Sequence, residues 1–449
     1  MKRFVETIRN IWSIKELKDR ILLTLGLILI YRVGNSVLLP GVDPTKLMNF
    51  EGDTQNGILG VLNAFTGGGF AKASVMALGI MPYISASIII QLMGMALPAV
   101  QKMQKDGESG RRKLNQITRY LTILIAGAQA PAYLSTMGVE PLGWLADSPF
   151  VFTSLTWLTL ITGTIFAMWL GERITDKGIG NGISLLITVG IIATLPQAFL
   201  QELAKQINDG GGWVFVIIEL FALFVVTMFA VALTQAVRQI PIQYAKQVAA
   251  GSRIPGASAA RQYLPLKVNA SGVMPIIFAQ AIMFIPPSIA QAMGSDGNVS
   301  TWIQVNLGDL SSFWYMFIFS LLIIVFTFFY TAIQVNTNNI ADDLKRNGGF
   351  VPGFKPGAPT AEFLDTVLSR ITFPGSIFLA VVAILPGMAI LLGLQPTWAF
   401  FFGGTSLLIA VGVILDTLQQ IESFLLNRHY DGLMKSGKLR GRNTQSTFS

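Results

Sequence analysis

The sequence predicts an all-α polytopic membrane protein, in which ten transmembrane helices form two pseudo-symmetric five-helix halves with a re-entrant half-helix between the first two spans. Three observations predict this class. Apolar side chains make up 52% of the 449 residues and charged ones only 12%, which is about half the charged fraction of soluble proteins. Apolar runs recur at the length of about 20 residues that a hydrocarbon core of roughly 30 Å requires. Basic residues concentrate in alternate connections, as they do when successive loops lie on opposite sides of a membrane.

Ten segments have the length and hydropathy of a membrane span. They are approximately residues 21–38, 76–97, 117–137, 151–170, 180–200, 213–236, 270–292, 312–334, 371–392 and 398–418. The first five belong to an N-terminal half, 21–200, and the last five to a C-terminal half, 213–418. The polar segment 201–212 is expected to be a hinge loop between them. Five spans in each half give the halves opposite orientations, as in inverted-repeat membrane proteins.

Positive charge predicts which side each loop occupies. The first segment, 1–20, and the tail, 419–449, are both basic, and an even number of spans places them on one side. All but four of the 32 Lys and Arg residues lie in these segments or in the loops on the same side; the four are Arg32, Lys46, Lys72 and Lys205. Both termini are therefore expected to be cytoplasmic. Apolar residues at helical spacing make 1–20 a candidate interfacial segment, with a disordered basic tail as the alternative.

The composition also restricts the chemistry that the chain can perform. It contains no cysteine and one histidine, which excludes disulfides, thiolate metal sites and histidine-rich metal centres. The phosphate-binding pattern G-x-x-x-x-G-K-[ST] is absent from the sequence. We therefore expect a protein that is not an enzyme and that has no cofactor and no metal site.

A short apolar stretch between the first two spans departs from the simple pattern. It runs from about 58 to 70 and contains three consecutive glycines, Gly67 to Gly69. It is too short to span the bilayer, and it is typical of a half-helix folded back into the membrane. Such a segment is tolerated only where protein or a water-filled cavity surrounds it. A loop that lies at the interface is the alternative.

Two cytoplasmic connections, at about 237–269 and 335–370, are long for a polytopic protein. The first carries basic residues and no acidic residue, and its glycines and prolines favour a structured hairpin. The second is rich in turn residues and places Lys355 at its tip. These loops are either simple connectors or a docking surface for a large acidic partner such as ribosomal RNA.

Six motifs follow one another along the chain. They are LGIMPYISASIIIQ at 78–91, KDGESGRRK at 105–113, GIGNGIS at 178–184, LPLKVN at 264–269, FVPGFKPG at 350–357 and FGGTSLLI at 402–409. Together they strongly resemble the SecY family, whose members are central subunits of the bacterial protein-conducting channel. The resemblance implies a multi-pass protein of the bacterial cytoplasmic (inner) membrane. It further implies translocation of unfolded polypeptides and lateral release of apolar segments into the bilayer.

The resemblance implies an hourglass-shaped channel with a ring of apolar side chains at its waist. By motif, the ring falls on Ile80, Ile84, Ile183, Ile187, Ile277 and Ile409. Isoleucine is stiff at χ1, and an apolar constriction dewets, so such a ring blocks ions and water while it yields around a moving chain. Isoleucine is also abundant in these spans, and spacing alone assigns none of them to a pore.

The resemblance also implies a plug and a lateral gate. The plug corresponds to the half-helix, and its residues are Ile58, Leu59, Gly60, Val61, Leu62, Asn63, Ala64, Phe65, Gly67, Gly68 and Gly69. The gate would open between spans two and three of one half and spans seven and eight of the other. Ser85 and Gln129 are expected in that seam, because intramembrane polar groups seek partners across helix contacts.

The resemblance also implies several partners, among them a motor or ribosome that drives translocation. They are SecE-like and SecG-like small membrane subunits, the SecA motor ATPase, the ribosome, signal-sequence-bearing polypeptides and membrane lipid. The residues expected to dock a driving partner are Lys246, Arg253, Arg261 and Lys355. At the last of these positions the family pattern usually has arginine. Lysine keeps the positive charge but lacks the planar guanidinium, which can donate two parallel hydrogen bonds to one phosphate or carboxylate.

A secondary transporter of a small solute is the alternative function, because it could share inverted halves and a broken helix. A transporter should place charged or polar ligands at the midplane, where isoleucines are expected here. Two charged residues inside the expected spans bear on this choice. Glu219 marks either a contact with a small partner subunit or a polar cavity, and Arg32 is expected to snorkel to the outer surface.

Overall fold

The computed structural model describes residue 12 and residues 14–42, 57–137, 148–208, 212–244, 262–293 and 298–435. Each of the ten predicted spans overlaps one of its helices. These helices are α2 (Lys15–Gly34), α5 (Met81–Ala96), α7 (Gly107–Met137), α8 (Pro149–Lys177), α9 (Gly182–Asn208), α10 (Gly212–Gln235), α12 (Met274–Met293), α14 (Phe313–Gln334), α16 (Ala358–Leu391) and α18 (Gly404–Lys435). In the described ranges, six helices are long and apolar enough to cross a membrane, or seven if α5 and the following α6 (Pro98–Lys105) form one bent span. The predicted class of polytopic helical membrane protein is confirmed.

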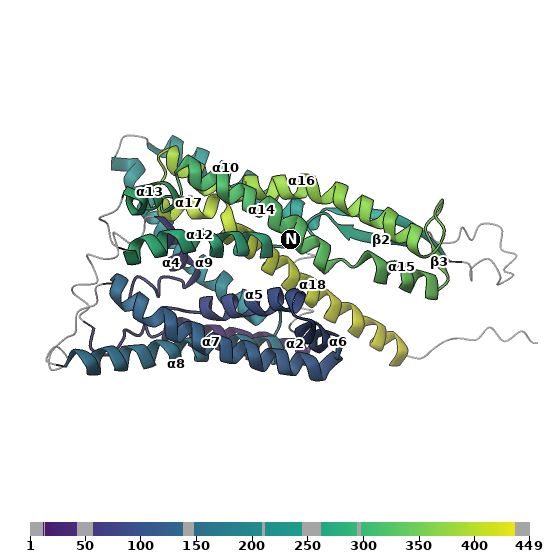
Figure 1. Cartoon of the computed structure of the whole chain (residues 1–449), viewed down its shortest axis with the longest axis horizontal. Helices are drawn as coiled ribbons and strands as arrows, with labels where there is room; N and C mark the ends of the chain where they lie inside the picture. The colour runs from purple at the N-terminus through teal and green to yellow at the C-terminus, as the bar shows by residue number, and fades with distance from the viewer. Residues whose placement is uncertain are drawn as a thin grey trace, which may run out of the picture.

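The long helices run along the length of the molecule and lie in two groups (Figure 1). Helices α2, α5, α7 and α8 form one group, and α10, α12, α14 and α16 form the other. Within the groups, α7 packs on α5 and α8, and α14 packs on α12 and α16. Helix α9 packs on both α8 and α18. Helices α9 and α18 therefore join the N-terminal helices to the C-terminal ones.

Short elements gather at the two ends of the long helices (Figure 1). At one end lie α6, the strands β2 and β3, and α15 (Thr337–Arg346). At the other end lie α4 (Gly57–Phe65), α13 (Asn298–Leu307) and α17 (Pro396–Ala399), which continues into the short helix η2 (Phe400–Phe402). The elements of the expected cytoplasmic loops therefore share one end of the molecule.

The two long loops meet in a small sheet that the all-α prediction did not include. Strand β1 (Val237–Tyr244) pairs antiparallel with β2 (Gln262–Lys267), and its other edge pairs with β3 (Gly349–Phe350). The hairpin predicted for the first loop is confirmed, and its tip lies outside the described residues. Side chains from β1, β2, α16 and the residue after β3 form a buried apolar core; they are Ile240, Leu266, Leu364 and Val351. This core binds the two loops into one unit.

Several helix boundaries differ from the predicted ones; α7 begins earlier, at Gly107, and α8 ends later, at Lys177. Helix α5 begins later, at Met81, because the preceding segment turns through Ala73 and Gly79, whose φ angles are 44° and 52°. Helices α16 and α18 extend beyond the predicted spans at Ala358 and Lys435, since charged residues that are too polar for a span still form a helix. Helix α9 continues to Asn208, so most of the predicted hinge loop is helical.

Candidate functional site

Five of the six predicted ring isoleucines belong to one apolar cluster at the contact between the two halves. The five are Ile84, Ile183, Ile187, Ile277 and Ile409, contributed by α5, α9, α12 and α18. Ile187 and Ile409 are buried, and the other three are half-buried. Ile80 lies instead in a neighbouring cluster with Tyr31, which Ile84 and Ile183 also contact. The structure therefore gathers residues that lie more than three hundred positions apart.

Helix α4 is the predicted half-helix, and it lies against this cluster. Phe65, its last residue, is 8% exposed and belongs to the same apolar cluster as Ile187 and Ile409. The helix ends at Phe65 and not at 70 as predicted, because Gly67 and Gly68 take φ angles of 67° and 87°. Glycine adopts such angles without steric cost. The three consecutive glycines therefore form a turn and not a continuation of the helix.

Two polar side chains at the C-terminal end of α2, those of Arg32 and of the capping residue Asn35, hold this glycine turn. Arg32 donates a hydrogen bond from Nη1 to the carbonyl oxygen of Gly67 at 3.1 Å. Asn35, which is 4% exposed, donates from Nδ2 to the carbonyl oxygen of Thr66 at 2.5 Å. Arg32, which was predicted to snorkel, is half-buried, and its guanidinium contacts this turn. The nearby turn offers an unpaired carbonyl that the guanidinium can reach within the protein.

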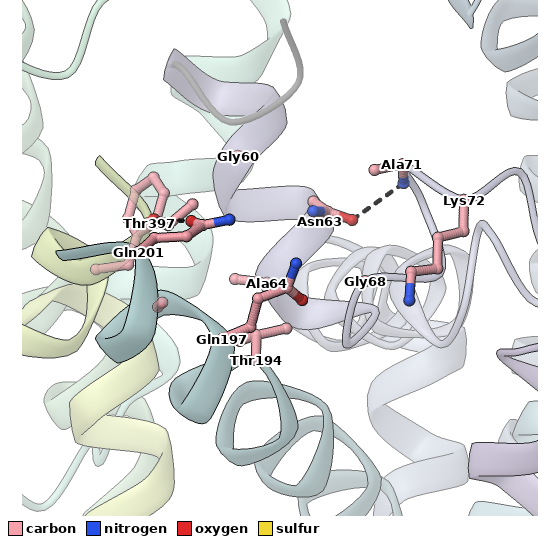
Figure 2. Close-up of a pocket in the computed structure, with 12 residues that line it drawn as sticks. Gly60, Asn63, Ala64, Gly68, Ala71, Lys72, Thr194, Gln197, Gln201 and Thr397 are labelled. Carbon is pink, nitrogen blue, oxygen red and sulfur yellow. Dashed lines mark hydrogen bonds between the residues drawn. The ribbon is translucent and has the colours of Figure 1, made fainter. Parts of the chain in front are cut away.

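A pocket lies between α4, α9 and the segment formed by α17 and η2 (Figure 2). Its polar lining comes mainly from amide and hydroxyl side chains: Asn63, Thr194, Gln197, Gln201 and Thr397. Asn63 Oδ1 accepts a hydrogen bond from the backbone N–H of Ala71 at 3.0 Å, as the dashed line in Figure 2 shows. Lys72 is the one charged residue of this lining. The described lining of this pocket therefore lacks the acidic side chains that bind the Na⁺ or H⁺ ions that drive many secondary transporters.

The seam between the two helix groups is bridged by a pair that the sequence did not indicate. Tyr330 of α14 donates from its hydroxyl to Gln91 Oε1 of α5 at 3.0 Å. Ser85 and Gln129 are both half-buried, and among the described side chains no hydrogen bond joins them. Gln91 lies in the motif at 78–91, and an amide inside an apolar span is a signal that could have identified it.

Glu219 belongs to a buried polar network at the end of α9 and the beginning of α10. Gln206 donates from Nε2 both to Glu202 Oε1 at 2.8 Å and to Glu219 Oε1 at 3.0 Å. The second oxygen of Glu202 accepts from the backbone N–H of Gln395 at 2.8 Å. Glu202 and Glu219 are 1% and 8% exposed. The network ties the end of the N-terminal half to the loop before α17, and this is a structural role that neither of the two predicted alternatives described.

Lys355 is exposed in an ordered turn at the end of the molecule that carries the sheet. Its carbonyl oxygen accepts a hydrogen bond from Thr360 Oγ1 at 2.8 Å. The neighbouring Phe354 stacks on Phe363 of α16 with ring centroids 4.1 Å apart. These contacts order the backbone of the turn that carries Lys355. The other predicted docking residues, Lys246, Arg253 and Arg261, lie outside the described residues.

Comparison with known proteins agrees with this architecture. The SecY family model matches residues 74–418. The protein translocase subunit SecY of Streptomyces scabiei is 42% identical over 94% of this chain and 97% of its own length. That of Bacillus licheniformis is 42% identical over 96% of this chain and 99% of its own.

Solved channel structures share the fold at lower identity. One, described as the structure of a protein conducting channel, has a TM-score of 0.60 at 17% identity and covers 90% of this chain and 91% of its own. Sec61 in the canine ribosome-channel complex has a TM-score of 0.58 at 17% identity, with the same coverage of the two chains. The family model and the bacterial relatives show that this chain belongs to the SecY family.

Proposed function

We propose that unfolded polypeptides pass between the two halves through the isoleucine cluster, with α4 as the plug and with lateral release between α5 and α7 on one side and α12 and α14 on the other. As a SecY-family protein, the chain is a multi-pass channel subunit of a bacterial protein translocase and not an enzyme. The observation that carries the proposal is the single apolar cluster that joins isoleucines of both halves to Phe65 of the half-helix. A midplane of this kind seals a channel and offers no ligands to a small polar solute.

The physical basis of the seal is dewetting. Ions and water cannot stay in a narrow passage lined by isoleucine, because nothing there replaces their hydration. A polypeptide separates the same side chains and fills the space that it opens. The seam beside the passage is closed by the hydrogen bond between Gln91 and Tyr330. Such a bond in a membrane contributes roughly 0.6 to 2 kcal/mol, which the apolar segment of a signal sequence can offset.

The driving partners belong to the proposal as well. A related channel is known in a ribosome-channel complex, and the exposed Lys355 suits contact with ribosomal phosphates or with the SecA motor. Helix α10 presents exposed Trp213, Phe221 and Phe224, a surface suited to lipid and to SecE-like or SecG-like small subunits. Residues 1–20 would lie at the cytoplasmic interface. The two five-span halves would separate about the connection between α9 and α10.

Translocation of a polypeptide and uptake of a small solute can be distinguished in reconstituted vesicles. With the motor ATPase and ATP, vesicles that contain the complex should protect a preprotein from added protease, because the polypeptide has entered the lumen. Vesicles without ATP are the control. Accumulation of a labelled small solute with no protection of the preprotein would support the transporter alternative.

The proposed orientation predicts which introduced cysteines an external reagent reaches. Cysteines placed singly at Ser109, Ser252 and Lys355 should stay unlabelled when an impermeant maleimide is added outside intact cells, and a cysteine at Ser148 should react. The native chain contains no cysteine, so background labelling is absent. Permeabilised cells provide the control for reactivity. External labelling at Ser252 would contradict cytoplasmic termini.

Charge reversal at the loop tips should weaken binding of the driving partner. Arg253→Glu with Lys355→Glu should reduce ribosome or motor binding to vesicles. Binding of the native chain should fall as salt rises, and that of the variant should fall less steeply, because fewer phosphate contacts release counterions. Lys355→Arg should bind at least as well as the native chain, since guanidinium adds bidentate geometry. Idle ion conductance should not change. Unaltered binding and translocation by the double reversal would make these loops simple connectors.

A further inference from the structure

Helix α13 presents an apolar face that the described part of the chain leaves uncovered. Val299, Trp302 and Val305 recur at every third residue, so they lie within roughly 120° on one side of the helix. Their exposed fractions are 73%, 48% and 63%. The helix contains no charged residue. Contact of such a face with water is unfavourable, and burial against another apolar phase removes that cost.

Contacts with both neighbouring helices fix the direction of this face. Ser300 is buried and donates from Oγ to the carbonyl oxygen of Ala290 in α12 at 2.8 Å. Leu307 is buried in the apolar cluster that joins the two halves. Helix α13 packs on both α12 and α14. Because Ser300 and Leu307 lie on the side of the helix opposite Trp302, the exposed face cannot turn inward without breaking these contacts.

The exposed face of α13 continues onto an exposed aromatic surface of α14. The rings of Trp302 and Trp314 pack with centroids 6.4 Å apart. Phe313 and Phe317 are both exposed, and their rings stack 6.1 Å apart. Helix α14 lies in the segment Phe313–Arg346, which is long and apolar enough to cross a membrane. The apolar surface of α13 is therefore continuous with the surface that this span turns toward lipid.

Length and composition restrict how α13 can meet the bilayer. It lies at the end of the molecule opposite the sheet (Figure 1). Its 10 residues are about 15 Å long, which is half of the roughly 30 Å that a span must cover. Short helices with one apolar face lie in the plane of the interface, and tryptophan is enriched at that depth. Since α13 has no Lys or Arg, its contact with lipid does not depend on anionic headgroups.

We propose that α13 is an interfacial helix whose face of Val299, Trp302 and Val305 is covered by lipid at the boundary between headgroups and acyl chains. In the proposed orientation this boundary belongs to the outer leaflet. Helix α13 connects α12 to α14, so it also fixes the depth of the adjoining ends of these two helices in the bilayer. Both helices border the lateral gate, and this last link alone rests on the proposed function.

Fluorescence quenching from lipid and from water tests the position of the face. The native chain contains no cysteine, so Val299→Cys, Val305→Cys and Gln304→Cys each give one site for an NBD fluorophore. The assembled complex is placed in vesicles of phosphatidylethanolamine and phosphatidylglycerol. Phosphatidylcholine with a doxyl group near the headgroup quenches from the interface, and iodide quenches from water. Gln304 is the matched control, because it is exposed on another side of the same helix.

Doxyl lipid should quench the fluorophores at 299 and 305 at least about threefold more than the one at 304, and iodide should show the reverse order. Omission of phosphatidylglycerol should not change the doxyl quenching. Iodide quenching at all three positions without doxyl quenching would overturn the inference. Protection of 299 and 305 from both quenchers would show that protein covers the face, and this would overturn it as well. None of these measurements requires translocation, so their failure is distinct from failure of the proposed function.

The depth of the adjoining helix end is tested with a fluorophore at Phe313→Cys, the first residue of α14. Its quenching is compared between doxyl groups near the headgroup and deep in the acyl chain. Trp302→Ala should change this ratio at least about twofold, because it removes the aromatic anchor. Trp169→Ala on α8 is the matched control, since Trp169 has the same exposed fraction of 48%. Equal ratios in the two variants would contradict the anchoring role of α13.

Discussion

Replacing Ile84 and Ile187 with glycine should make the idle channel leak ions. Both side chains contact the apolar cluster that also holds Phe65 of the plug, and a dry constriction depends on continuous apolar walls. Burial of one isoleucine side chain contributes roughly 2 kcal/mol, so the loss of two should raise the resting conductance at least about tenfold. Recording from the complex in planar bilayers measures this. Discrimination between signal sequences should also relax.

Two exposed isoleucines on the same helices provide the matched control. Ile89 of α5 and Ile192 of α9 are 38% and 47% exposed, so Ile89→Gly with Ile192→Gly imposes the same helix penalty without touching the cluster. This control should conduct like the native chain. If both double variants leak equally, helix destabilisation explains the leak and the isoleucine cluster is not the seal.

Bridging the lateral seam should abolish translocation reversibly. Gln91→Cys on α5 and Tyr330→Cys on α14 replace the hydrogen-bonded pair, and a cleavable bis-maleimide then joins the two helix groups. Because a signal sequence must part these groups to enter lipid, secretion and membrane insertion should both stop. Cleavage of the linker should restore both activities.

A bridge inside one half controls for chemical damage. Gly127 of α7 and Trp157 of α8 lie in contact, since Trp157 Nε1 donates to the carbonyl oxygen of Gly127 at 2.9 Å. Cysteines at this pair join two helices that remain together in the proposed opening. Translocation should survive this bridge. A channel that secretes normally with the seam bridged would show that the exit lies elsewhere.

The long helices could be predicted because membrane insertion selects length and hydropathy, and both are local properties of the sequence. The half-helix was predicted from its shortness and its glycines. The extension of α16 to Ala358 was missed, because residues 358–370 include charged side chains and hydropathy does not identify a helix outside the membrane. The sheet was missed in part, since β3 has two residues and pairs with a strand that is distant in sequence.

Pairings between distant residues were the least predictable part of the site. The contact of Arg32 with Gly67 depends on where a turn exposes its carbonyl oxygen. The network of Glu202, Gln206 and Glu219 depends on the close approach of two helix ends. Hydropathy identifies such residues as unusual within a span and does not specify their partners. The isoleucines were assigned from the family resemblance. Only the fold shows that five of them lie in one cluster.

The most direct test of the central claim is a stalled polypeptide with a single cysteine at its midpoint. Disulfide formation is measured with channel variants carrying Ile84→Cys, Ile187→Cys, Ile409→Cys or Phe224→Cys, the last being 65% exposed on α10. A chain that passes between the halves should bond to the three isoleucine positions and not to position 224. Bonds at 224 with none at the isoleucine positions would show that polypeptides do not pass through this cluster.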